Sequence, residues 1–313
     1  KTPTDLSNRR PESFRLTQIR LKLWQPFERK ELPGSAEGCG GDVGVDWHKA
    51  KIVRTEVEIE YVFSDATSVT ETKALIVILP STGRGAEDLK PIGAEMARMG
   101  FKVALPQPRG IHGSKGYSTK PTLLDFASDV AAVIEAHTEA HRAIVCGHAF
   151  GCWVARALAE TRPDLVRAVV QIAAGGSSWA PSLTDDIDVA ADHNQSNASR
   201  LAALARAFFY DPTAAASWLE GWYPNVIRMQ RAARKATLPE SWQASGSAPI
   251  FDLIAREDPF RPPSSYNDFS KPFGARVEKA FIDKASHGLP EEKPLETANA
   301  IADWLARMNL AKA

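Results

Sequence analysis

Runs of apolar residues alternate with helical patterns through most of the chain. The run 74–79 is continuous, rich in β-branched residues and followed by Pro80, which predicts a strand buried on both faces. Partial alternation between 53 and 61 predicts one earlier strand. Later strands are predicted at 101–106, 143–146, 168–172, 249–255 and 275–282, and helices at 86–99, 123–140, 149–160 and 295–308. This alternation predicts a mainly parallel sheet with helices on both faces.

The alternation of strands and helices is interrupted between residues 176 and 246. This stretch is rich in alanine and aromatic residues, and 199–209 and 223–236 have helical composition. We interpret it as a helical lid inserted into a core made of 51–175 and 247–313. Most aromatic side chains of such a lid pack it against the core, and some line a substrate pocket. The candidates for that second role are Trp179, Trp218 and Trp222.

Residues 1–50 lack the regular pattern of the rest. A basic stretch with interspersed apolar residues is followed by the glycine-rich segment 38–44. We interpret residues 1–50 as an N-terminal extension. Two arrangements fit its composition: a segment that wraps the core or caps the site, and a solvated arm.

The bulk composition excludes several classes of protein. The 313 residues contain 38 Lys and Arg and 38 Asp and Glu, so the basic excess typical of a nucleic-acid-binding protein is missing. No apolar run approaches the roughly 20 residues that span a bilayer, and no signal-peptide core is visible. The sequence therefore slightly favours the cytoplasm, although a chain that begins at Lys1 is also compatible with removal of a leader. The sequence does not indicate an oligomeric state.

Cysteines contribute no disulfide framework. Cys39, Cys146 and Cys152 are three in number and have no metal-ligand spacing. The simplest interpretation is that they are small, buried apolar residues of the core.

The most informative sequence lies between the strand 143–146 and the helix that follows it. Gly147 and Gly151 bracket Ala149 with the spacing of a Gly-x-Ser-x-Gly motif. Such a motif forms a sharp strand-to-helix turn that exposes one side chain above the sheet, and glycines flank it because side chains there would clash. The helix N-terminus beneath the turn stabilises negative charge.

Residues from about 50 to 310 resemble α/β hydrolases of the capped esterase, lactonase and C–C hydrolase kind. The sequence Gly-His-Ala-Phe-Gly at 147–151 is similar to that family's Gly-His-Ser-Phe-Gly elbow, with Ala149 in the place of the serine nucleophile. The resemblance implies an α/β-hydrolase fold and a small-molecule ester or lactone as substrate. It implies no cofactor and no metal.

Two further segments match the order of the family's catalytic triad, which is nucleophile, acid and histidine. Asp258 follows the strand after the lid, where the family carries its acid, and His287 follows the last strand. The resemblance implies that Asp258 orients His287 and that His287 is the general base. Asp252, within the strand, and Glu257, one residue out of register, are the weaker candidates for the acid.

The resemblance also implies an oxyanion hole made of two backbone N–H groups. Phe150 is expected to supply one, and Thr82, in the loop after the strand 74–79, the other. Ser81 is the alternative to Thr82 and is also a candidate for binding the substrate. Many relatives have His-Gly where this chain has Pro80-Ser81. Arg84 in the same loop is a candidate for binding a substrate carboxylate, or else a solvated arginine.

Ala149 cannot act as a nucleophile, so the chain is expected to be nearly inactive. Either a serine was replaced to stop turnover, or a natural non-catalytic protein, such as a receptor, uses the pocket for binding. We favour the first because the acid, the histidine and both glycines are intact. Two rivals remain: a nucleophile rerouted to Cys146 or Cys152, and a lid that serves as a scaffold for a protein partner. The parent activity is expected to be hydrolysis of a medium-sized, partly apolar ester or lactone through an acyl-enzyme.

Overall fold

A nine-stranded sheet forms the centre of the computed structural model, which describes residues 28–31, 44–65, 73–116, 118, 120–137 and 142–313. The strand order is β1-β2-β3-β5-β4-β6-β7-β8-β9. The strands are β1 (Glu28–Glu31), β2 (His48–Val53), β3 (Glu58–Ser64), β4 (Leu75–Leu79), β5 (Lys102–Pro106), β6 (Ala143–His148), β7 (Val166–Ile172), β8 (Ile250–Ala255) and β9 (Val277–Ile282).

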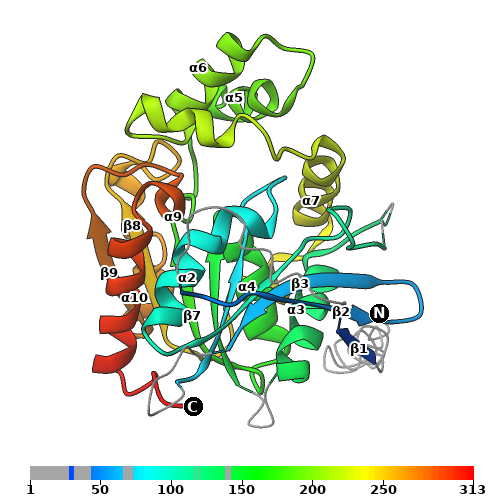
Figure 1. The fold of residues 1–313 in the computed structure, drawn as a ribbon. Coiled ribbons are helices and arrows are strands. Elements are labelled where there is room, and N and C mark those ends of the chain that lie inside the picture. Colours follow the sequence, from blue (N-terminus) through cyan, green and yellow to red (C-terminus); the bar gives the residue numbers. More distant parts are fainter. Residues whose placement is uncertain (1–27, 32–43, 66–72, 117, 119, 138–141) are drawn as a thin grey trace, which may run out of the picture.

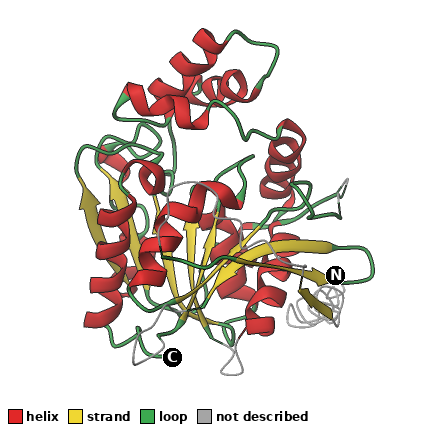
Figure 2. Cartoon of the chain, viewed as in Figure 1, coloured by secondary structure: helices red, strands yellow, loops and turns green. Residues whose placement is uncertain are grey.

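The six strands from β5 to β9 in the sheet are parallel, and helices cover both faces (Figures 1 and 2). Alternate residues of each strand enter different cores. Ile76 and Ile78 pack with α2 (Lys90–Arg98) and α10 (Pro294–Arg307), and Val77 packs with α3 (Leu123–His137) and α4 (Phe150–Thr161). The predicted α/β-hydrolase fold with a mainly parallel sheet is therefore confirmed.

The beginning of the sheet differs from the sequence-based prediction. The strand predicted between 53 and 61 is confirmed at 58–61, which belong to β3, but residues 54–57 form a turn between the antiparallel strands β2 and β3. The described strand β1 pairs with β2, so the segment 1–50 contributes to the sheet. The basic stretch and most of the glycine-rich segment lie outside the described residues.

The helix predicted at 86–99 is divided. A short 3-10 helix, Ala86–Leu89, precedes α2. Pro91 in the first turn of α2 has no N–H to donate to a carbonyl four residues earlier, so one continuous α-helical ladder cannot run through this point.

A helical insertion separates β7 from β8. It contains α5 (Ser182–Ala191), α6 (Asn197–Ala207), the 3-10 helix Pro212–Trp218, α7 (Pro224–Ala236) and the 3-10 helix Pro239–Ser241. In Figure 1, α5 and α6 lie above the carboxyl ends of the parallel strands, and α7 lies to one side of α5 and α6. The short helices α8 (Ser270–Phe273) and α9 (Leu289–Glu292) follow β8 and β9, with the 3-10 helices Pro263–Ser265 and Gly274–Arg276 around α8.

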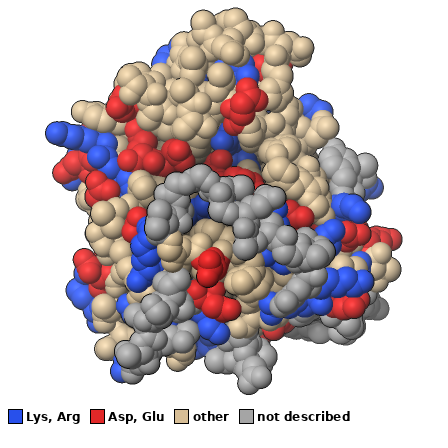
Figure 3. All heavy atoms as spheres, viewed as in Figure 1, with Lys and Arg blue, Asp and Glu red and all other residues tan. Residues whose placement is uncertain are grey.

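The surface carries charges of both signs. On the face shown in Figure 3, Lys and Arg are interspersed with Asp and Glu over the described part of the lower half. Among the described residues, no helix combines the length and the apolar character that crossing a membrane requires.

Candidate active site

The turn between β6 and α4 exposes one side chain at the end of the sheet. Ala149 has φ 49° and ψ −106°, outside the conformations that non-glycine residues usually adopt. His148 and Phe150 are buried, whereas Ala149 is partly exposed. A non-glycine residue held in such a conformation stores strain that the surrounding structure must offset, and such residues concentrate at functional sites.

Close packing explains both glycines of the motif. A Cβ atom at Gly147 would lie 2.2 Å from the carbonyl carbon of Gly151, and one at Gly151 would lie 2.5 Å from the carbonyl oxygen of Leu79. Both neighbours are backbone atoms that cannot turn aside. The two glycines thus allow α4 to start directly against β4 and β6.

Asp258 and His287 form a buried pair at the same end of the sheet. The Nδ1 atom of His287 lies 2.8 Å from Oδ2 of Asp258, and the other carboxylate oxygen accepts the backbone N–H of Phe260 at 2.8 Å. The carboxylate is fully shielded from solvent. Because Nδ1 is engaged by Asp258, Nε2 is the nitrogen of His287 left for proton transfer.

The two other acidic candidates have different partners. Oδ2 of Asp252 accepts a hydrogen bond from the guanidinium of Arg261 at 2.7 Å, in a pair that is completely buried. Burial raises the pKa of Asp252 to about 6, against the lowering effect of Arg261. Glu257 accepts the backbone N–H of Ala285 at 3.2 Å.

His148 joins the turn to the loop that carries His287. Its Nε2 donates to the backbone carbonyl of His287 at 2.6 Å. Burial, followed by the neighbouring His287 ring, lowers the pKa of His148 to about 3, so its imidazole is neutral at physiological pH. His148 thus fixes the backbone of the loop that carries His287.

Residues of the helical insertion form hydrogen bonds to the loop after β4. The backbone N–H of Gly83 donates to Oε1 of Gln230 at 2.8 Å. The backbone carbonyl of Gly83 accepts the N–H of Tyr223 at 3.0 Å. Within the described residues, the backbone N–H groups of Thr82 and Phe150 have no protein acceptor. Ser81 is buried, and its carbonyl accepts the N–H of Arg84 at 3.3 Å.

Comparison with known proteins now identifies the family. The family model described as "Alpha/beta hydrolase family" matches residues 76–300. The chain belongs to the alpha/beta hydrolase family. No protein in the curated comparison set matches it.

Three solved structures share the fold of this alpha/beta hydrolase at low sequence identity. A bacterial membrane phospholipase A is 16% identical, covers 95% of this chain and 92% of its own, and has a TM-score of 0.67. A thermophilic esterase from Thermogutta terrifontis is 18% identical, with coverages of 90% and 98% and a TM-score of 0.63. The epoxide hydrolase CorEH is 16% identical, with coverages of 84% and 99% and a TM-score of 0.62.

Arg84 is neither solvated nor free to bind a substrate with its whole guanidinium group. It is 2% exposed and donates to Asp88 through Nε at 2.6 Å and Nη2 at 2.8 Å. Nη1 donates to the backbone carbonyl of Glu220 at 2.5 Å. The guanidinium carbon lies 4.6 Å from the ring centre of Trp218 and 4.9 Å from that of Trp222. Arg84 thus holds the insertion against the loop after β4.

The three tryptophans named from the sequence pack in or against one hydrophobic cluster. Trp218 and Trp222 are buried in a cluster that packs over the histidines, with the Trp218 and His148 ring centres 6.0 Å apart. Trp179 packs against the edge of this cluster, with its ring 5.7 Å from that of Phe260, and it also lines the wall of a separate cavity. Phe260 in turn contacts the His287 ring at 4.4 Å.

Cys146 and Cys152 are both buried. Burial raises the pKa of each thiol, that of Cys152 to about 12, so both stay protonated and poorly nucleophilic. The Sγ–H of Cys152 donates to the carbonyl of Gly147 at 2.9 Å. Cys39 lies outside the described residues.

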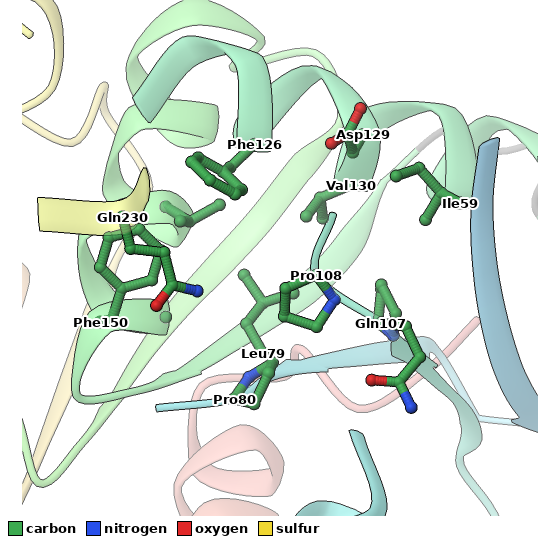
Figure 4. Close-up of a pocket in the computed structure, with 13 residues that line it drawn as sticks. Ile59, Leu79, Pro80, Gln107, Pro108, Phe126, Asp129, Val130, Phe150 and Gln230 are labelled. Carbon is green, nitrogen blue, oxygen red and sulfur yellow. The ribbon is translucent and has the colours of Figure 1, made fainter. Parts of the chain in front are cut away.

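A small cavity of about 40 Å³ adjoins the turn (Figure 4). Leu79, Pro80, Phe150 and Gln230 line part of it. It has room for a group the size of a methyl or a water molecule rather than for a substrate. The amide nitrogen of Gln230 has no hydrogen-bond partner among the described residues and points toward the cavity.

Gln230 was not among the residues singled out from the sequence. The available signal was its position on α7, where it shares a buried face with Val226 and Ala233. A polar residue in the apolar stripe of a helix needs a partner. The sequence could not show that the partner is the backbone of Gly83, because the two residues are 147 positions apart.

Proposed function

We propose that this protein is built as a serine-type hydrolase for esters or lactones and that Ala149 makes the present chain nearly inactive. The observation that carries the proposal is the buried Asp258–His287 hydrogen bond of 2.8 Å at the end of the sheet where the strained turn exposes residue 149. An acid, a histidine and an exposed turn in this chain order are what a Ser-His-Asp mechanism needs.

With serine at position 149, the roles of the surrounding groups follow from their contacts. His287 would take the hydroxyl proton through Nε2 while Asp258 holds Nδ1 and stabilises the imidazolium. The N–H groups of Phe150 and Thr82 would stabilise the oxyanion of the tetrahedral intermediate. His287 would then activate the water that cleaves the acyl-enzyme.

We further propose that residues 176–246 act as a lid on a core formed by 51–175 and 247–313. The support is an aromatic side chain of this segment that packs over the histidine: the ring centre of Phe208 lies 5.6 Å from that of His287, and Phe260 of the core adds a second ring at 4.4 Å. Such an environment suits a medium-sized, partly apolar acyl or lactone group. The thermophilic esterase among the structural neighbours is consistent with this reaction class.

The decisive experiment compares the present chain with its Ala149→Ser variant on p-nitrophenyl esters and lactones of increasing length. We expect Ala149→Ser to raise kcat/KM by at least about 10⁴-fold, the order lost when a serine hydrolase loses a triad member. Ala149→Gly is the matched control, because it changes the same position without adding a hydroxyl. In the Ser background, His287→Ala and Asp258→Asn should each abolish most of the gain.

The alternative function is ligand binding without turnover. The observation that favours it is Ala149 itself, which leaves a complete Asp–His pair with nothing to activate. If the folded Ala149→Ser variant hydrolyses none of these compounds while the Ala149 form binds one of them, ligand binding without turnover becomes the better account of the function.

A further inference from the structure

A second, larger cavity lies away from the residues of the proposed mechanism. Its volume is about 540 Å³, which is in the range of small-molecule sites. α4, the end of α7 and the segments 175–179, 242–244 and 268–273 form its walls. None of its lining residues belongs to the turn 147–151 or is Asp258 or His287.

One wall carries a buried guanidinium that forms no direct ion pair with any described acidic residue. Arg156 is only 6% exposed, and it donates to Oγ of Ser245 at 2.9 Å and to the carbonyl of Gln243. Its guanidinium carbon lies 4.8 Å from the ring centre of Trp242 and 5.1 Å from that of Phe269. No described carboxylate lies within ion-pair distance of Arg156; the carboxylate whose charge acts on it is the buried one of Asp252, which is already paired with Arg261.

A second guanidinium faces the same tryptophan. The guanidinium carbon of Arg234 lies 4.6 Å from the ring centre of Trp242 and 4.9 Å from that of Trp153. Its Nε is buried without an acceptor, and no described carboxylate pairs with it. Burial lowers the pKa of both arginines, which still remain charged at neutral pH. Two like charges at one aromatic wall repel each other unless an anion joins them.

The cavity contains too little negative charge to balance these two groups. Asp268 is the acidic residue among those that line it, and its Oδ2 accepts the backbone N–H of Ser177 at 2.7 Å. Asp268 forms no described ion pair with Arg156 or Arg234. The remaining walls are mainly aromatic, including Trp179 and Phe273.

We propose that this cavity binds an organic anion with an aromatic or apolar body, of the arylalkyl carboxylate class. The carboxylate pairs with the free N–H groups of Arg234 and Arg156, since guanidinium groups bind carboxylates through paired, charge-assisted hydrogen bonds. The apolar body packs on the tryptophan rings. The site is linked to the turn, because the Trp153 ring lies 5.9 Å from that of Phe150, the neighbour of Ala149.

The test measures the binding of phenylacetate and of its neutral analogue phenylacetamide to the Ala149 protein by calorimetry and tryptophan fluorescence. We expect phenylacetate to bind at least about 10-fold more tightly than phenylacetamide. Arg234→Gln should remove that preference, and Arg234→Lys should keep part of it. Arg228→Gln is the matched control, because Arg228 is an exposed arginine on the same helix, and it should leave the preference intact.

A gain of affinity separates the proposal from damage to the fold. Asp268→Asn keeps an acceptor for Ser177 and removes the negative charge, so it should tighten phenylacetate binding several-fold and leave phenylacetamide unchanged. Equal affinities for the two compounds, or a phenylacetate affinity that neither Arg234→Gln nor Asp268→Asn alters, would overturn the proposal. Hydrolysis of neutral esters by the Ala149→Ser protein should persist in the Arg234→Gln background, so the two proposals fail independently.

Discussion

The side-chain oxygen of Gln230 accepts the backbone N–H of Gly83 at 2.8 Å and thereby ties α7 to the loop after β4. That loop contains Thr82, the proposed oxyanion donor. Arg84 adds a second tie from the same loop to the carbonyl of Glu220. The position of the proposed oxyanion donor thus depends on the helical insertion as well as on the sheet.

Removal of the Gln230 acceptor should lower activity in the Ala149→Ser background. Gln230→Met keeps the volume and leaves the buried Gly83 N–H unsatisfied, which costs about 1–3 kcal/mol. We expect kcat to fall roughly 10-fold and KM to change little, because the loop would stabilise the transition state rather than bind substrate. Steady-state kinetics beside the exposed-site control Arg231→Gln check this. Equal kcat values in the two variants would contradict it.

Gly151→Ala should destabilise the protein. Its Cβ would lie 2.5 Å from the carbonyl oxygen of Leu79, and overpacking of this kind costs about 1–3 kcal/mol. Gly274→Ala is the comparison, because Gly274 has a φ of +57° but no neighbour within 4 Å of a Cβ, so only backbone strain of roughly 1 kcal/mol is added. Urea unfolding of both variants should show the larger loss for Gly151→Ala. A larger loss of stability for Gly274→Ala than for Gly151→Ala would contradict this prediction and would mean that the turn 147–151 can widen to accept a Cβ atom.

His137 should make the fold sensitive to acid. Burial, followed by the charge of Arg29, lowers the pKa of His137 from near 6.5 to about 4. Between these values the unfolded chain binds a proton that the folded chain does not, so stability falls as the pH falls from about 7 to 4. The contribution between pH 7 and pH 5 is on the order of 1–2 kcal/mol.

Chemical unfolding of His137→Gln at pH 7 and at pH 5 tests this origin. Glutamine can still bond to the Tyr61 hydroxyl, which lies 2.9 Å from Nε2 of His137, but it cannot titrate in this range. The loss of stability between the two pH values should be smaller in the variant than in the parent chain. An identical loss would assign the acid sensitivity to other groups.

Cys146 and Cys152 should be inert toward thiol reagents in the folded protein. Both are buried, and the pKa of Cys152 is raised to about 12, so the thiolate fraction is negligible at pH 8. In a Cys39→Ser background, DTNB should label neither thiol until denaturant is added. Cys152→Ala should also leave the activity of the Ala149→Ser protein in place. Rapid labelling of the native protein, or loss of activity in Cys152→Ala, would contradict this prediction and would support the hypothesis that a cysteine is the nucleophile.

The sequence by itself determined the parallel sheet and its helices. Residues 74–79 and 143–146 are buried on both faces, and a strand surrounded by core on both sides needs a continuous apolar run that is visible without any partner. The spacing of Gly147, Ala149 and Gly151 likewise located the turn, because the close backbone contacts there admit only glycine on either side.

The tertiary structure decided which side chains meet. The sequence contained several acidic residues near position 258, and the fold brings the carboxylate of Asp258, not that of Asp252, to His287. It also buried Arg84, which its loop sequence left open to solvent, and it paired Gln230 with Gly83 across 147 residues. Local patterns fix secondary structure because its hydrogen bonds and apolar faces repeat at short intervals. Contacts between distant residues leave no such repeat in the chain, so only the packed structure reveals them.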